Sequence, residues 1–218
     1  MITAANRQQA RLGGGPPVYV ATASAQFSAA GTVTLNYPTG TVEGDLIIAA
    51  VGQDAFESTF TITGWTVIYA PGGTAGGTGA YYYKIAGAET SVSVSSSAAT
   101  NRGGVVLTTY TSAAYGGSDG GGYTAPNTSP ANSGAVTAAV DDIVLAAVVV
   151  DEGPSITAIP SGYTEQINVL LGSVNNGVTL GVADKVITSA GSEDPSAWTT
   201  AAPGGATCIY ITILITGV

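Results

Sequence analysis

The chain has 218 residues and a formal net charge of −9, and only 9% of its residues are charged, against about 25% in typical domains. An acidic body of this kind repels nucleic acid and anionic lipid, which excludes both as main partners. With no histidine and a single cysteine, Cys208, the chain lacks an intrachain disulfide, histidine-based catalytic systems and histidine metal sites.

Residues 1–17 form a polar, mildly basic segment that ends in three glycines and two prolines. Glycine is flexible and proline is stiff and extended, so we expect a flexible N-terminal arm. It is either a disordered terminus or a tether that docks on a neighbouring subunit through Ile2, Arg7, Arg11 and Leu12. The arm has no apolar core of a secretory signal, and no run approaches a membrane span, so we expect synthesis in the cell interior.

Short apolar or alternating runs separated by glycine, proline and asparagine predict strands throughout the chain. No segment carries a 3.6-residue apolar pattern, so very little helix is expected. The first half is predicted to have strands at residues 18–22, 32–36, 46–51, 60–63, 65–70, 80–85, 90–95 and 102–111. The glycine-rich residues 71–79 lack the Gly-Lys-Ser/Thr ending of a phosphate-binding loop.

Residues 41–54 organise the chain, because a turn with Asp45 precedes an unbroken apolar run that predicts a strand buried on both faces. The same pattern returns at residues 139–152, where Asp142 takes the place of Asp45. Later elements of the second half also match the first, and Asn176-Gly177 predicts a tight hairpin turn. We therefore expect pseudo-repeats at about residues 32–112 and 134–218, joined by a Gly/Ser/Pro-rich loop over residues 113–133.

The predicted fold is an all-β, single jelly-roll-like β-sandwich built from these two pseudo-repeated halves and spanning residues 18–218. We expect one domain, because each half has too few wide apolar faces to cover its central strands alone. Together the halves would give about ten strands in two sheets. Asp45 and Asp142 would then lie near a pseudo-two-fold axis.

Carboxylates are the only abundant reactive groups, and two are enough for a glycosidase. However, Asp45 and Asp142 each stand at a turn, where aspartate commonly accepts hydrogen bonds from local amides. Calcium prefers oxygen ligands, but the cluster Asp141, Asp142, Asp151 and Glu152 is split between the two ends of one strand. We predict no catalytic residues, no metal ligands and no cofactor.

Tyrosines suggest a further possibility. Tyr81, Tyr82 and Tyr83 are consecutive, so their rings point alternately to the two faces of a strand, where core packing is the usual role. Tyr115, Asp119 and Tyr123 fall in the expected loop, where they could contact a glycan.

Three motifs together, Gly44-Asp45-Leu46-Ile47-Ile48-Ala49-Ala50, Thr63-Gly64-Trp65-Thr66 and Tyr82-Tyr83-Lys84-Ile85-Ala86-Gly87, carry a family resemblance. With a weaker second copy that ends in residues 181–185, they resemble the duplicated β-sandwich domain of tailed-bacteriophage virion proteins. That group includes capsid decoration proteins, tail proteins and fibre tips. The resemblance covers about residues 32–218 and implies no catalytic residues.

The resemblance implies a virion structural protein that is made in the host cytoplasm. We expect a capsid cement or decoration protein that binds capsid subunits as a homo-oligomer, with a trimer favoured. The alternative is a lectin-like tail or fibre-tip module that binds a host glycan.

Overall fold

The computed structural model describes residues 15–55, 58–70, 77–124, 134–201 and 208–218. Within these residues the chain forms seventeen strands and no helix, which confirms the prediction of an all-β sandwich. The first half contains β1 (Val18–Gln26), β2 (Thr32–Asn36), β3 (Leu46–Gln53), β4 (Phe60–Ile62), β5 (Thr66–Tyr69), β6 (Thr78–Ile85), β7 (Ser91–Ser96) and β8 (Gly103–Thr111). The second half contains β9 (Ala113–Thr124), β10 (Val136–Ala138), β11 (Ile143–Asp151), β12 (Ile156–Ala158), β13 (Thr164–Ser173), β14 (Asn176–Val186), β15 (Gly191–Glu193), β16 (Thr199–Thr200) and β17 (Cys208–Gly217).

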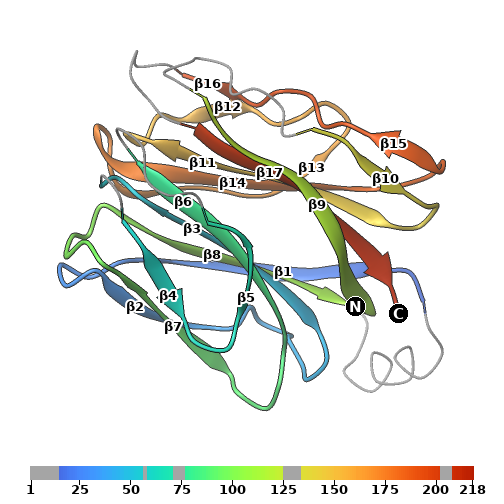
Figure 1. The fold of residues 1–218 in the computed structure, drawn as a ribbon, viewed down its shortest axis with the longest axis horizontal. Coiled ribbons are helices and arrows are strands. Elements are labelled where there is room, and N and C mark those ends of the chain that lie inside the picture. The colour runs from blue at the N-terminus through green and yellow to red at the C-terminus, as the bar shows by residue number, and fades with distance from the viewer. Residues whose placement is uncertain (1–14, 56–57, 71–76, 125–133, 202–207) are drawn as a thin grey trace.

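Two five-stranded antiparallel sheets stack face to face at the centre of the molecule (Figure 1). Their strand orders are β1-β8-β3-β6-β5 and β9-β17-β11-β14-β13. Each strand of the first order therefore has a counterpart at the same place in the second. The sequence repeat is thus also a repeat of topology, with β3 and β11 as the matching central strands.

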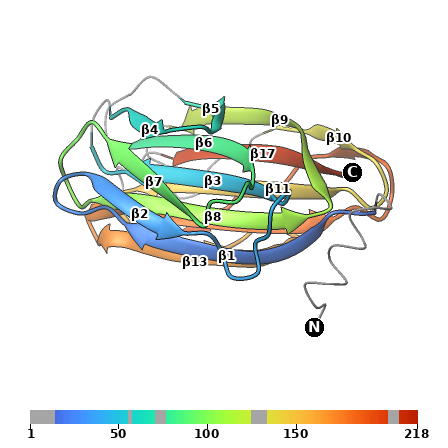
Figure 2. The ribbon, with the colours of Figure 1, turned by 90° about the horizontal axis from the view of Figure 1, so that it is seen from below.

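Three small sheets cover the outer faces of this pair. The sheet β2-β7-β4 packs on the first central sheet, and the pairs β10-β15 and β12-β16 pack on the second. Figure 2 shows β2 and β7 in front of the first central sheet. The sequence analysis predicted about ten strands in two sheets and missed these outer layers as separate sheets. Each half is itself a two-layered unit, and the first half winds eight strands as a jelly roll does.

Apolar and polar residues do not alternate along β3 because both faces of this strand are covered. Leu46, Ile48 and Ala50 point into the core between the two central sheets. The intervening Ile47, Ala49 and Val51 point to the outer core beneath β2-β7-β4. Since both faces of the strand are covered, every residue of β3 is buried, and β11 is buried in the same way.

The halves are joined at Ser112, a single residue between β8 and β9 with a left-handed φ of 54°. The prediction of a connecting loop over residues 113–133 is therefore wrong for residues 113–124. These residues form the edge strand β9, which pairs with β17. Their glycine-rich composition indicated a loop, but β9 forms because β17 supplies a paired backbone along its whole length. Residues 125–133 lie outside the described part.

Two further boundaries differ from the sequence analysis. The hairpin between β13 and β14 is present, but its loop is Val174-Asn175, and Asn176 and Gly177 already pair with Ser173 and Gly172. At the N-terminus, Gly15 donates its backbone N–H to the carbonyl of Val218 at 3.1 Å. Residues 15–17 therefore belong to the body rather than to a free arm, and residues 1–14 lie outside the described part.

The two organising turns have the same left-handed backbone but different residues. Gly44 has φ 85°, and Asp141, at the matching position before β11, has φ 71°. Only glycine adopts this conformation without steric cost, although aspartate tolerates it better than most residues. The second half therefore carries a local strain that the first half avoids.

Replacing Gly44 by alanine should lower the free energy of unfolding by about 1–2 kcal/mol, because alanine is strained at positive φ. The reverse change in the other half, Asp141→Gly, should be neutral or stabilising by up to about 1 kcal/mol. Urea unfolding followed by tryptophan fluorescence measures both. Equal destabilisation by the two substitutions would contradict this account of the turns.

Candidate functional site

Asp45 and Asp142 are used within their own turns. The backbone N–H of Val42 donates to Asp45 Oδ2 at 2.7 Å, and that of Ala139 donates to Asp142 Oδ2 at 2.8 Å. Both carboxylates are buried, and each organises the turn before a central strand. The interpretation of these residues as turn formers accounts for both, and neither is presented to a ligand.

Asp54 and Asp151 are equivalent carboxyls that meet between the halves. Asp54 follows the end of β3, and Asp151 ends β11, each nine residues after its turn aspartate. Their side chains lie within hydrogen-bonding reach of each other. Asp151 is 3% exposed, and its Oδ1 has no hydrogen-bond partner among the described residues. The structure therefore places two acceptor groups together, with Asp151 buried and Asp54 partly exposed.

The surroundings of Asp151 explain its titration. Burial, followed by the charges of Asp54 and Glu152, raises its pKa from 3.8 to about 7. Burial also raises the pKa of Asp54, although the nearby Arg102 favours the ionised form. Gly77, just before β6, lies so close that a Cβ there would be 2.7 Å from Asp151 Cγ. Asp151 of the second half is thus packed directly against backbone of the first half.

No group of three His, Cys, Asp or Glu side chains suited to a metal ion occurs in the described residues. Asp141 and Asp142 precede β11, whereas Asp151 and Glu152 stand at its other end. These four carboxylates therefore do not converge, as their spacing in the sequence indicated.

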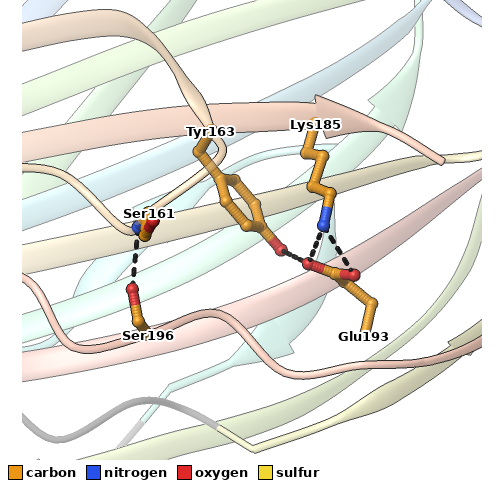
Figure 3. Close-up of polar contacts among 5 residues, drawn as sticks. All are labelled: Ser161, Tyr163, Lys185, Glu193 and Ser196. Atoms are coloured by element: carbon orange, nitrogen blue, oxygen red, sulfur yellow. Dashed lines mark hydrogen bonds and ion pairs between the residues drawn. The ribbon is translucent and has the colours of Figure 1, made fainter. Parts of the chain in front are cut away.

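A lysine–glutamate pair ties the inner layer of each half to the outer part of the same half. In the second half, Lys185 of β14 contacts both carboxylate oxygens of Glu193 in β15, at 2.8 and 2.9 Å (Figure 3). Tyr163 donates its hydroxyl to Glu193 Oε1 at 3.1 Å, and the Lys185 ammonium lies 5.8 Å from its ring centroid. Burial, followed by the charge of Glu193, raises the pKa of Tyr163. These contacts fix β15 against the central sheet.

The first half has a related cluster built from Lys84, Glu89 and Tyr37. Lys84 forms an ion pair with Glu89, and the Tyr37 hydroxyl donates to Glu89 Oε1 at 3.1 Å. The Lys84 contact, followed by backbone and Tyr37 donors, lowers the pKa of Glu89 to about 2. An open hollow of about 590 Å³ lies beside the cluster and includes Asn36, Tyr37, Thr41, Glu89 and Thr90 among its lining residues.

The three predicted glycan contacts lie on β9 rather than on a loop. Tyr115 is partly buried and stacks on Tyr83 with ring centroids 4.5 Å apart. Asp119 is exposed and accepts a bond from the Gly120 N–H at 2.6 Å. Tyr123 pairs through its backbone with Ile209, while its side chain lies outside the described part. Tyr115 is thus occupied in packing the halves together.

The predicted partner contacts Ile2, Arg7, Arg11 and Leu12 all lie outside the described residues. Sequence reasoning missed the Asp54–Asp151 pair, although both aspartates are visible at the same distance after the repeated turn. That repeat is the signal that could have identified them. It also missed Asp184, which accepts bonds from the Tyr110 hydroxyl at 2.9 Å and Gln166 Nε2 at 2.8 Å.

Tyr110→Phe should lower the free energy of unfolding by about 1.5–3 kcal/mol, because it removes a donor from a buried carboxylate. Burial already raises the pKa of Asp184, and a carboxyl with a raised folded-state pKa loses stability as pH rises. The loss should therefore be larger at pH 8 than at pH 5. Denaturant unfolding at both pH values measures this, with the exposed hydrogen bond of Tyr37 removed by Tyr37→Phe as the control. A pH-independent loss of unfolding free energy, no larger than that of the control, would contradict the role of Tyr110 as a donor to a buried carboxylate.

Cys208 should resist thiol reagents in the folded protein. It is fully buried, and burial, followed by the charge of Asp151, raises its pKa to about 12. Because the thiolate is the reactive form, labelling by a disulfide reagent at pH 8 should require unfolding. Rapid labelling of the native protein would show that this end of β17 is open.

The described residues contain no helix long and apolar enough to cross a membrane. Comparison of the chain with protein-family models, with curated proteins and with solved structures finds no match.

Proposed function

We propose that this chain is a structural protein of a tailed-phage virion, and specifically a capsid decoration protein that binds capsid subunits. The resemblance of its repeated motifs to virion β-sandwich domains supports the proposal. So does a surface poor in charge, since only 9% of the residues are charged. Such a surface is built from small residues and can lie flat against a neighbouring protein.

The main support for the proposal is that the polar groups with strong interactions make their contacts within the sandwich itself. Asp45 and Asp142 hold turns, Glu89 and Glu193 anchor outer segments, and Asp184 bridges the central sheets. Within the described residues these groups make internal contacts rather than a nucleophile–base arrangement. This use of charge fits a particle component better than an enzyme.

The sheet edges indicate which surfaces can serve in assembly. The ladder of each edge strand of the central sheets, β1, β5, β9 and β13, has an irregular register. Bulges at edges hinder the addition of a further strand. Contacts with capsid subunits, and between copies in the favoured trimer, are therefore assigned to faces, loops and the arm of residues 1–14 rather than to edge pairing.

A second candidate function is binding of a host glycan by a tail or fibre-tip module. The hollow beside Tyr37 and Glu89 favours it, because its volume of about 590 Å³ lies in the range of ligand sites and it combines an aromatic ring with polar side chains. This hollow, rather than the surface around Tyr115 and Tyr123, is therefore the candidate glycan-binding site. A glycan array that shows binding lost on Tyr37→Ala would favour this function over decoration.

Removing residues 1–14 should leave the sandwich folded and weaken its binding to phage heads at least tenfold. The arm carries Arg7 and Arg11 with no acidic residue, and its ordering cost of about 1–2 kcal/mol per residue requires that Ile2 and Leu12 be buried as well. Co-sedimentation with heads that lack the protein measures this.

The truncated chain should begin at Gly15, since Gly15 contacts Val218 in the body. Unchanged unfolding in urea is the control for folding. If the truncated chain binds heads as tightly as the full chain, the hypothesis that the arm is a tether is wrong. If neither chain binds heads, decoration itself is wrong.

A further inference from the structure

Asp54 and Asp151 occupy equivalent positions in the two halves and meet where the halves join. Nearby, Gly52 of β3 faces Val149 of β11, also an equivalent position, so closely that a Cβ at Gly52 would be 2.5 Å from Val149 Cγ1. An approximate two-fold relation between the halves brings such matching positions together. The carboxyl contact is thus part of the joint between the halves, at the opposite end of the central strands from Asp45 and Asp142.

Two ionised carboxylates cannot hydrogen-bond to each other, because both are acceptors only. A protonated carboxyl supplies the missing donor. Asp151 Oδ1 is buried without a partner among the described residues, so a proton on the pair would serve an acceptor that is otherwise unsatisfied. Repulsion between two neighbouring negative charges also opposes double ionisation of the pair.

Among the described groups around Asp151, the backbone N–H of Glu152 donates to its carboxylate and partly offsets this, whereas the nearby charges do not. Asp54 and Glu152 add negative charge, and Cys208 of β17 is a neutral buried thiol. Arg102 faces Asp54 rather than Asp151. Within the described part of the chain, the pair therefore has one cation, Arg102, on its more exposed side and none on its buried side.

We propose that Asp54 and Asp151 share one proton at neutral pH and below, and that this proton makes them a pH-sensitive latch between the two halves of the sandwich. Loss of the proton leaves two negative charges side by side at the joint, and the charge on Asp151 is buried. The ends of β3 and β11 then repel each other, and this end of the molecule loosens. The latch is a property of the chain itself and does not depend on its role in a virion.

The direction of the pH effect follows from the raised pKa of about 7 for Asp151, against 3.8 for an ordinary aspartate. Between these values the folded state holds a proton that the unfolded state has lost, so stability falls as pH rises. For one proton, the unfolding equilibrium constant should rise about tenfold per pH unit. From pH 5 to pH 8.5 the total rise should be about a hundredfold, and most of it should occur before the rise levels off above the pKa.

The test compares wild type with Asp151→Asn and Asp54→Asn in urea unfolding between pH 5 and pH 8.5, followed by the fluorescence of Trp65 and Trp198. An asparagine amide supplies the donor permanently, so either substitution should remove most of the hundredfold change. Asp141→Asn is the matched control, because Asp141 is an exposed aspartate at the other end of β11. It should keep the wild-type pH dependence.

Carbon-13 NMR of the aspartate carboxyl groups in the wild-type protein gives an independent readout that needs no variant to fold. A carboxyl signal that titrates near pH 7 and disappears in Asp151→Asn would support the latch. Hydrogen exchange should accelerate above pH 7, beyond the intrinsic base-catalysed rise, at the ends of β3 and β11. If every aspartate titrates near its ordinary value, or if Asp151→Asn keeps the wild-type pH dependence, the latch is wrong.

Discussion

The structure depends on the packing of β3 against β11, the central strands of the two five-stranded sheets. Each strand is buried on both faces, between an inner core that the halves share and an outer core of its own. Glycine makes the closest approach possible, since a Cβ at Gly79 would lie 3.0 Å from Ile209 and 3.1 Å from Val149. Because fully burying one aliphatic side chain contributes about 1.5–3 kcal/mol, this doubly covered pair dominates the stability of the fold.

Duplication gives the two halves the same topology, but the joint between them is not symmetric. Tyr83 of β6 and Asp184 of β14 occupy matching positions, opposite Ile48 and Leu145. Tyr83 stacks on Tyr115, whereas Asp184 binds Tyr110 and Gln166. One side of the joint is thus held by aromatic packing and the other by a buried polar network. Such differences specify one register for the docked halves, since a half-satisfied polar network would be costly.

The lysine–glutamate contacts between the inner and outer layers also start from matching positions in the two halves but use different partners. Lys84 and Lys185 stand at matching places, yet their glutamate partners come from different points in the outer segments. Tyr37 follows β2 in one case and Tyr163 precedes β13 in the other. The function of the tyrosine–glutamate–lysine contact is retained while its sequence spacing is not.

Much of the fold could be predicted from the sequence, because the strongest signals were local. The unbroken apolar run of β3, its recurrence in β11 and the absence of helical periodicity predicted the all-β class and the repeat. The strand β9 could not be predicted in this way, since Gly116, Gly117 and Gly120–Gly122 are turn residues by composition. Its pairing with β17 is a tertiary effect. The Asp54–Asp151 contact depends on how the halves dock, which no local pattern specifies.

Native-state hydrogen exchange of β3 and β11 is the most direct test of the claim that the two halves form one unit through their central strands. At a pH below 7, the slowest amides of both strands should exchange with the same free energy, equal to that of global unfolding measured with denaturant. If the amides of one strand exchange at a clearly lower free energy than those of the other, the halves unfold separately and the account is contradicted.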